Sequence, residues 1–114
     1  MQLRLTKPWR DLAAVSSREL PGQLGVYQLA NAAGEVVYIG YAGGRELFGL
    51  RSALERHRDL AIAGVAKGAV LFRYEVNMQY QSRYRELLML HKADNGALPI
   101  GNLDDHPVHL GRIG

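Results

Sequence analysis

The sequence predicts an α+β domain with a small, mostly antiparallel sheet of three strands covered by helices, in the order β-β-α-β-α. Residues 25–30 and 35–40 are rich in β-branched and aromatic residues, and the turn residues 31–34 join them. An alternating stretch at 69–76 and two segments with helical spacing follow. A hairpin with a third strand has an apolar face, and the helices are needed to cover that face.

The elements follow from local signals along the chain. Residues 1–21 form a lead-in expected to pack on the core, with a short edge strand in "LRLT" and a helix start offered by Thr6 and Pro8. The helical segment 45–64 contains Gly49, which disfavours a helix, so the regular helix is expected to begin at Leu50. Gly64 is the expected stop of that helix.

The later elements carry clearer patterns. In 69–76, every second residue from 70 to 76 is apolar and is expected to point to one side of the sheet. Residues 79–96 predict a helix that ends at Asn95 and Gly96, a common helix terminus. The domain proper is expected to span residues 22–103, with residues 104–114 as a tail.

Composition narrows the classes of function. At 114 residues the chain predicts one domain, and the absence of cysteine excludes a disulfide framework or a thiolate zinc site and favours a reducing cytoplasm. There is no apolar run of membrane-spanning length and no secretory signal, so we expect a cytoplasmic protein without a membrane partner. A net charge of +3 permits a polyanionic partner without requiring one.

The predicted hairpin contains two short motifs, each with a glycine, an aliphatic residue and a tyrosine. "GVY" at 25–27 and "YIG" at 38–40, followed by a basic helix, resemble the GIY-YIG nuclease family. Glu86 followed by "LLML", and then Pro99 and Asn102, match that family's order of a helix glutamate, a proline and an asparagine. The resemblance covers roughly residues 22–103.

The resemblance implies a metal-dependent endonuclease that hydrolyses phosphodiester bonds in DNA, including branched or damaged DNA, in repair or recombination. By resemblance, Tyr27 is the general base and Tyr38 supports it. Glu86 would hold one divalent ion, Mg²⁺ or Mn²⁺, and Asn102 looks like the residue that braces the site. A phenol needs a nearby cation to lower its pKa before it can act as a base at neutral pH. A divalent ion held by one carboxylate and several water molecules can also bind phosphate oxygens. We expect a monomer or a weak homodimer.

The arginine of the family pattern is displaced in this chain. That pattern has an arginine four residues before a histidine on the first helix, but here Ala53 stands four residues before His57. Arg51 is the favoured replacement because the preceding loop is longer than usual, although two residues along a helix is a rotation of about 200°. Arg45 or Arg56 could supply the guanidinium instead, or the activity is lost.

A group on and before the first helix is expected to contact substrate. Basic side chains there would give sequence-independent affinity for a nucleic-acid backbone. The members are Gly40, Arg45, Arg56, His57 and Arg58.

Each candidate also has a structural reading. Strand tyrosines are common for packing alone, His57 could be a satisfied half-buried histidine, and Asn102 could cap a turn. The tail holds Asp104, Asp105, His106 and His109, but without the helical spacing of known zinc motifs. Two rival functions therefore stand beside the nuclease: a catalytically silent nucleic-acid-binding or interaction domain, and a small structural protein.

Overall fold

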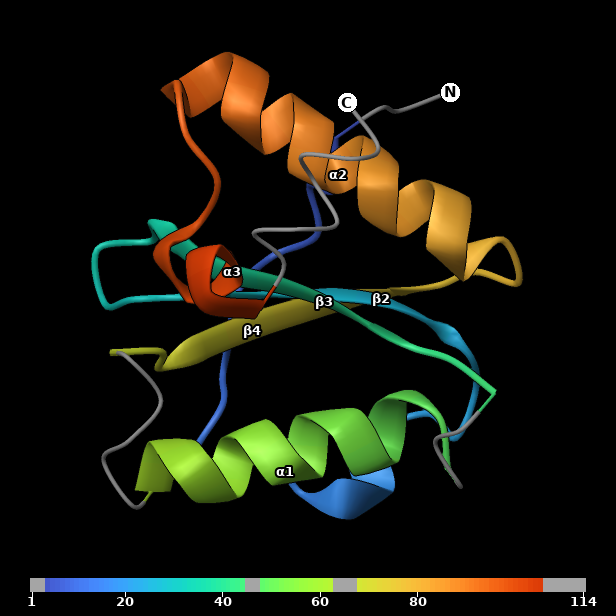
Figure 1. Ribbon diagram of the computed structural model, residues 1–114. Helices are drawn as coiled ribbons and strands as arrows, with labels where there is room; N and C mark the ends of the chain where they lie inside the picture. The colour runs from blue at the N-terminus through green and yellow to red at the C-terminus, as the bar shows by residue number, and fades with distance from the viewer. Residues whose placement is uncertain (1–3, 45–47, 63–67, 106–114) are drawn as a thin grey trace.

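The protein is built on a four-stranded antiparallel sheet with the strand order β1-β4-β2-β3. It is seen in a computed structural model that describes residues 4–44, 48–62 and 68–105. Helix α1 (Leu50–Ile62) covers one face of the sheet and α2 (Tyr80–Asn95) covers the other (Figure 1). Among the described residues, no helix is long and apolar enough to cross a membrane.

The predicted hairpin lies at the centre of the fold. Strand β2 (Gly25–Ala30) has the predicted bounds, and β3 (Val36–Ala42) runs two residues further than expected. Their antiparallel pairing sets Tyr27 opposite Gly40 and Leu29 opposite Tyr38. Strand β4 (Leu71–Val76) pairs with the other edge of β2, so all six β2 residues are buried.

The prediction of three strands was wrong, because the lead-in adds a fourth. The two-residue strand β1 (Arg10–Asp11) pairs with the outer edge of β4, where a helix start had been expected just upstream. An edge strand presents unpaired backbone groups, and pairing with β1 satisfies some of them. The lead-in also enters the core: Leu12 and Leu20 are buried on the α1 face, and Leu5 is buried on the α2 face.

The helix boundaries follow the glycines. Helix α1 begins at Leu50 as predicted, directly after Gly49, whose φ of 54° favours glycine. Its predicted stop, Gly64, lies outside the described residues. Helix α2 ends as predicted at Gly96, which is left-handed with φ 79° and donates its amide hydrogen to the Lys92 carbonyl.

A short helix that was not predicted packs against one edge strand of the sheet. Helix α3 (Ile100–Asp105) packs against β3, the edge strand far from β1. The side chain of Asn102 is fully buried there. Its Oδ1 accepts the Ile39 amide hydrogen at 2.8 Å, and its Nδ2 donates to the Ile39 carbonyl at 2.8 Å. One side chain thus replaces the neighbouring strand that β3 lacks at this point.

We predict that Asn102→Ala lowers the free energy of unfolding by about 2–4 kcal/mol, because it leaves two buried backbone groups of Ile39 without partners. Urea unfolding of the whole chain measures the change. The matched control is Asn95→Ala, which removes one exposed hydrogen bond to the His91 carbonyl and should cost less than about 1 kcal/mol. Equal losses in the two variants would contradict this role of Asn102.

Candidate active site

The two tyrosines of the motif lie together on the α1 face of the sheet. Tyr27 is 2% exposed and belongs to the core cluster that α1 covers, and Tyr38 packs against that cluster while half-buried. Their ring centroids are 6.1 Å apart. The hairpin register produces this contact, because Tyr38 is opposite Leu29, two residues from Tyr27 and on the same side of the pleat.

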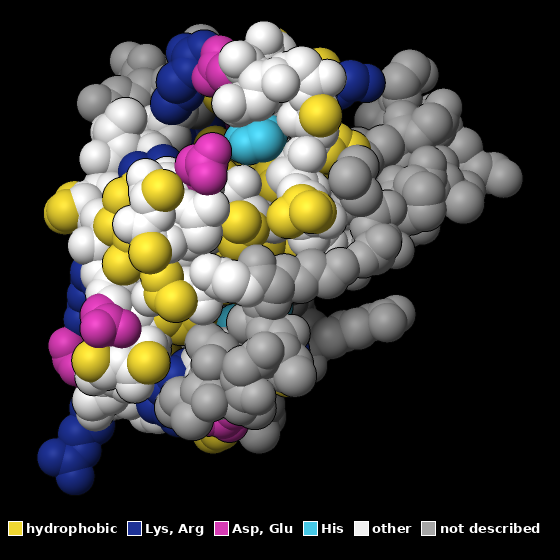
Figure 2. Space-filling model, turned by 90° about the vertical axis from the view of Figure 1, so that its left-hand side faces the viewer, with side chains coloured by type: hydrophobic (Ala, Val, Ile, Leu, Met, Phe, Trp, Pro, Cys, Tyr) yellow, Lys and Arg dark blue, Asp and Glu magenta, His cyan; other side chains and the backbone are white. Residues whose placement is uncertain are grey.

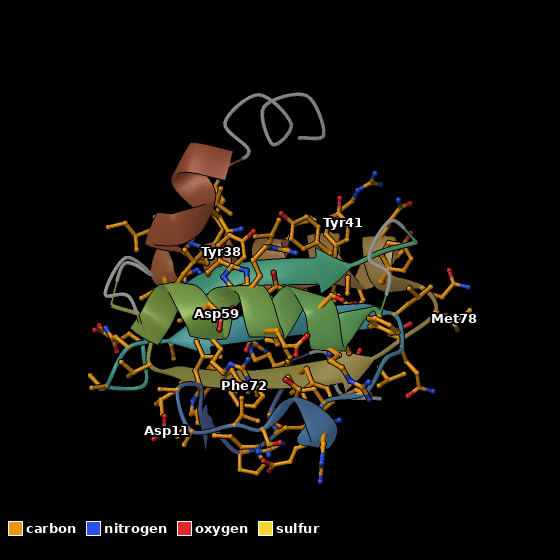
Figure 3. The ribbon with its side chains drawn as sticks, turned by 90° about the horizontal axis from the view of Figure 1, so that it is seen from below. Asp11, Tyr38, Tyr41, Asp59, Phe72 and Met78 are labelled. Carbon is orange, nitrogen blue, oxygen red and sulfur yellow. The ribbon has the colours of Figure 1, made fainter. Side chains whose placement is uncertain are left out.

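Helix α1 adds a histidine to the tyrosine pair. Ala53 and Leu54 are fully buried, and His57 lies one turn further along the same side of the helix. The Nε2 atom of His57 is 2.8 Å from the Tyr27 hydroxyl oxygen, a hydrogen-bond distance. The imidazole centroid is 5.3 Å from the Tyr27 ring and 5.2 Å from the Tyr38 ring. Figure 3 shows Tyr38 beside α1, toward the side where α3 packs.

Gly40 and α3 hold this cluster in place. A Cβ atom on Gly40 would lie 2.4 Å from both Cζ and Oη of Tyr27, and 2.8 Å from the Tyr38 ring. On the other side, a Cβ on Gly101 would lie 3.0 Å from Tyr38 Cδ1, so α3 approaches Tyr38 closely. Asn102 fixes Ile39, the residue between Tyr38 and Gly40. Asn102 is thus connected to Tyr38 and Gly40 through the Ile39 backbone, and its role in bracing a catalytic site stays a prediction.

Arg51 and Arg58 of α1 bind the lead-in and not the two tyrosines. Ala53 faces the core, so the helix has not turned to bring Arg51 to the tyrosines. Arg51 Nε instead donates to the Leu20 carbonyl at 3.1 Å. Arg58 likewise turns to the lead-in, where its Nη1 donates to the Val15 carbonyl at 3.2 Å. Arg56 is exposed on α1, and Arg45 lies outside the described residues.

Glu86 lies across the sheet from the tyrosines. It accepts a hydrogen bond from Arg83, which also donates to Glu75 at 2.9 Å. Glu75 is opposite Val26, and Val26 belongs to the core cluster under α2. Although burial alone favours the neutral acid, the hydrogen bonds from Arg83 and Asn77 lower the pKa of Glu75. The Arg83 guanidinium therefore bridges two carboxylates on the α2 face.

This arrangement bears on the predicted metal. A partly exposed carboxylate is a suitable oxygen donor for Mg²⁺ or Mn²⁺, but Arg83 already supplies the positive charge beside Glu86. No group of three His, Asp or Glu side chains that could hold a metal occurs in the described part of the chain. The described residues do not fit a metal shared between Glu86 and the two tyrosines. His106 and His109 of the tail lie outside those residues.

Comparison with known proteins places the chain in a family. A family model described as a domain of unknown function, DUF7508, matches residues 1–94. The chain belongs to the DUF7508 family. No curated protein and no solved structure matches it. The matched part of the DUF7508 domain contains Tyr27, Tyr38 and His57 and ends before Asn102.

The hydrogen bond between His57 and Tyr27 is the feature of this DUF7508 domain that sequence reasoning missed. His57 was considered as a phosphate contact or a satisfied half-buried histidine. The sequence does contain a signal for the position of His57. His57 follows Leu54 by three residues and Ala53 by four, so all three lie on one side of α1. That spacing gives the side of the helix but not the strand residue that it meets.

We predict that Gly40→Ala displaces the Tyr27 ring and lowers the free energy of unfolding by about 1–3 kcal/mol, the usual cost of overpacking. Urea unfolding measures this, and Gly44→Ala is the control because its Cβ would meet no heavy atom within 4 Å. Adding Tyr27→Leu to Gly40→Ala removes the clashing ring atoms. The double variant should therefore lose less stability than the sum of the two single changes. Additive losses would contradict the close contact.

Proposed function

We propose that this domain hydrolyses phosphodiester bonds in DNA, with Tyr27 and His57 acting as a coupled acid–base pair. The observation that carries the proposal is the 2.8 Å contact between Tyr27 Oη and His57 Nε2. The resemblance of the two triplets to the GIY-YIG nucleases supports the reaction class and Tyr27 as the base, and His57 adds an acceptor for the Tyr27 proton.

The pair addresses the weakness of a phenol as a base. A free phenol has a pKa of about 10, so only about one in a thousand is ionised at pH 7, whereas a free imidazole has a pKa of about 6.5. In the proposed step, water forms a bond to phosphorus and gives its proton to Tyr27 Oη. The Tyr27 proton passes to His57 Nε2, and the leaving oxygen departs and takes a proton from solvent. This requires the His57 tautomer that carries its proton on Nδ1.

Burial assigns different duties to the two tyrosines. Tyr27 is 2% exposed and Tyr38 is half-buried. A phosphodiester would meet Tyr38 before Tyr27, and the proposed step requires that a water molecule reach the Tyr27 hydroxyl. Tyr38 is therefore the group that orients water or substrate. Arg56, exposed on the same helix as His57, is the candidate contact for the phosphate backbone.

We derive no step through a divalent ion. Glu86 would be the residue to hold such an ion, which would polarise a phosphoryl oxygen, but its carboxylate is bound to Arg83 on the face of the sheet away from Tyr27. Mg²⁺ or Mn²⁺ nevertheless belongs in the assays, because the resemblance implies it.

A second candidate function, nucleic-acid binding without cleavage, rests on the contacts of the charged residues predicted for the site. Arg51 and Arg58 are bound to carbonyls of the lead-in, and Glu86 is bound to Arg83. If these contacts persist with DNA bound, the charge stabilisation that phosphoryl transfer needs is lacking. The domain would then bind nucleic acid without cutting it.

We predict that Tyr27→Phe lowers turnover by about 100-fold or more, the usual scale for loss of a general base, while Tyr38→Phe has a smaller effect. The assay measures cleavage of single-stranded, nicked, branched and duplex DNA with Mg²⁺ or Mn²⁺ present. Tyr74→Phe is the matched control, because Tyr74 is the cross-strand neighbour of Tyr27 and packs on the same core. It should cleave like the wild type.

Three outcomes separate the proposals. Loss of turnover in a Tyr27→Phe variant that remains folded, as shown by a cooperative thermal melt, supports the coupled pair. Cleavage by Tyr27→Phe at the wild-type rate contradicts the mechanism while leaving the activity. Binding of DNA by the wild type without cleavage of any of the four substrates favours the second candidate.

A further inference from the structure

A cavity of about 340 Å³ lies on the α2 face of the sheet, on the opposite side from Tyr27 and His57. The start of the lead-in, the sheet and the last turns of α2 line it, and Val36, Leu87 and Leu90 form the apolar part of its wall. Figure 2 shows one side of the molecule, on which a histidine side chain lies near acidic, basic and hydrophobic side chains. Small-molecule sites usually measure about 300–1,000 Å³ and combine an apolar wall with a few polar groups.

Arg73 of β4 is one of the charged residues of the cavity wall, and it donates hydrogen bonds to neutral groups. Its Nε donates to Gln28 Oε1 at 2.8 Å, and its Nη1 donates to the Lys7 carbonyl at 3.1 Å. Its Cζ atom lies 4.0 Å from the centre of the Trp9 ring. The amide, the carbonyl and the indole are all neutral. Asp94 also lines the cavity, but its two carboxylate oxygens accept hydrogen bonds from Arg4 at 2.7 and 2.9 Å.

Arg73 therefore differs from Arg83, which lies on the same face of the sheet. Arg83 is bound to two carboxylates, which raise its pKa against the effect of burial. For Arg73, burial lowers the pKa. A partly buried charge without an opposite charge is costly, and an anion beside it offsets that cost. An anion bound in the cavity would offset the cost of burying the Arg73 charge.

We propose that this cavity binds a small organic anion, with a carboxylate or phosphate headgroup against Arg73 and a short apolar body against Val36, Leu87 and Leu90. A guanidinium offers planar donors that match either headgroup. The cavity is near the lower end of the usual size range, which favours a compact ligand over a polymer backbone. This inference is independent of the nuclease proposal, because it uses the other face of the sheet.

The test is titration calorimetry of the full chain with phenyl phosphate, benzoate, inorganic phosphate and uncharged benzamide. We expect saturable binding of phenyl phosphate or benzoate, and at least tenfold weaker binding of benzamide. The stronger of the two aromatic anions identifies the headgroup, and inorganic phosphate tests whether the apolar body contributes. Arg73→Gln should weaken binding at least tenfold. Arg85→Gln removes the same charge from an exposed position on α2 and should leave binding unchanged.

A second variant keeps the test decisive if Arg73→Gln fails to fold. Leu90→Trp fills the cavity from α2 without altering the guanidinium, and it should also weaken binding at least tenfold. No saturable binding of either aromatic anion by the wild type would overturn the proposal. Wild-type affinity in Leu90→Trp, or in a folded Arg73→Gln, would overturn it as well.

Discussion

The pleat of β2 is the constraint on which both faces of this molecule depend. The strand is paired on both edges and covered on both faces, so each of its side chains must point to α1 or to α2. Tyr27 and Leu29 join the core under α1, and Val26 joins the core under α2. A shift of one residue in register would exchange these two sets. Gly40 opposite Tyr27 and the Asn102 contacts to Ile39 both oppose such a shift.

The two faces carry different chemistry as a result. The α1 face brings two phenols and an imidazole together. The α2 face holds Arg73 among neutral partners and Arg83 between two carboxylates. Because the sheet separates the two faces, each proposal can be tested without disturbing the residues of the other.

The parts of the fold that sequence could predict are those with local causes. Strand β2 is rich in β-branched and aromatic residues, and Gly49 and Gly96 mark helix ends through backbone angles that favour glycine. The parts that it missed depend on distant partners. Strand β1 is only two residues long and exists because β4 offers a free edge, and α3 is held to β3 through Asn102. Neither pairing leaves a periodic pattern in the chain.

The same distinction applies to the site. The tyrosine pair could be predicted because hairpin register is local, whereas the side of the sheet that Glu86 occupies depends on the packing of α2, where Arg83 binds both Glu86 and Glu75. The expectation that Arg51 reaches the tyrosines required a rotated helix, and the burial of Ala53 shows that α1 keeps the unrotated orientation.

The central claim is that Tyr27 and His57 form one hydrogen-bonded pair, and ¹⁵N NMR of the His57 imidazole tests it most directly. The nitrogen shifts report which ring nitrogen carries the proton in the neutral form. The account predicts a single tautomer with the proton on Nδ1, a change in the Nε2 shift in Tyr27→Phe, and no change in Tyr74→Phe. An Nε2 shift that is the same in the wild type and in Tyr27→Phe would contradict it.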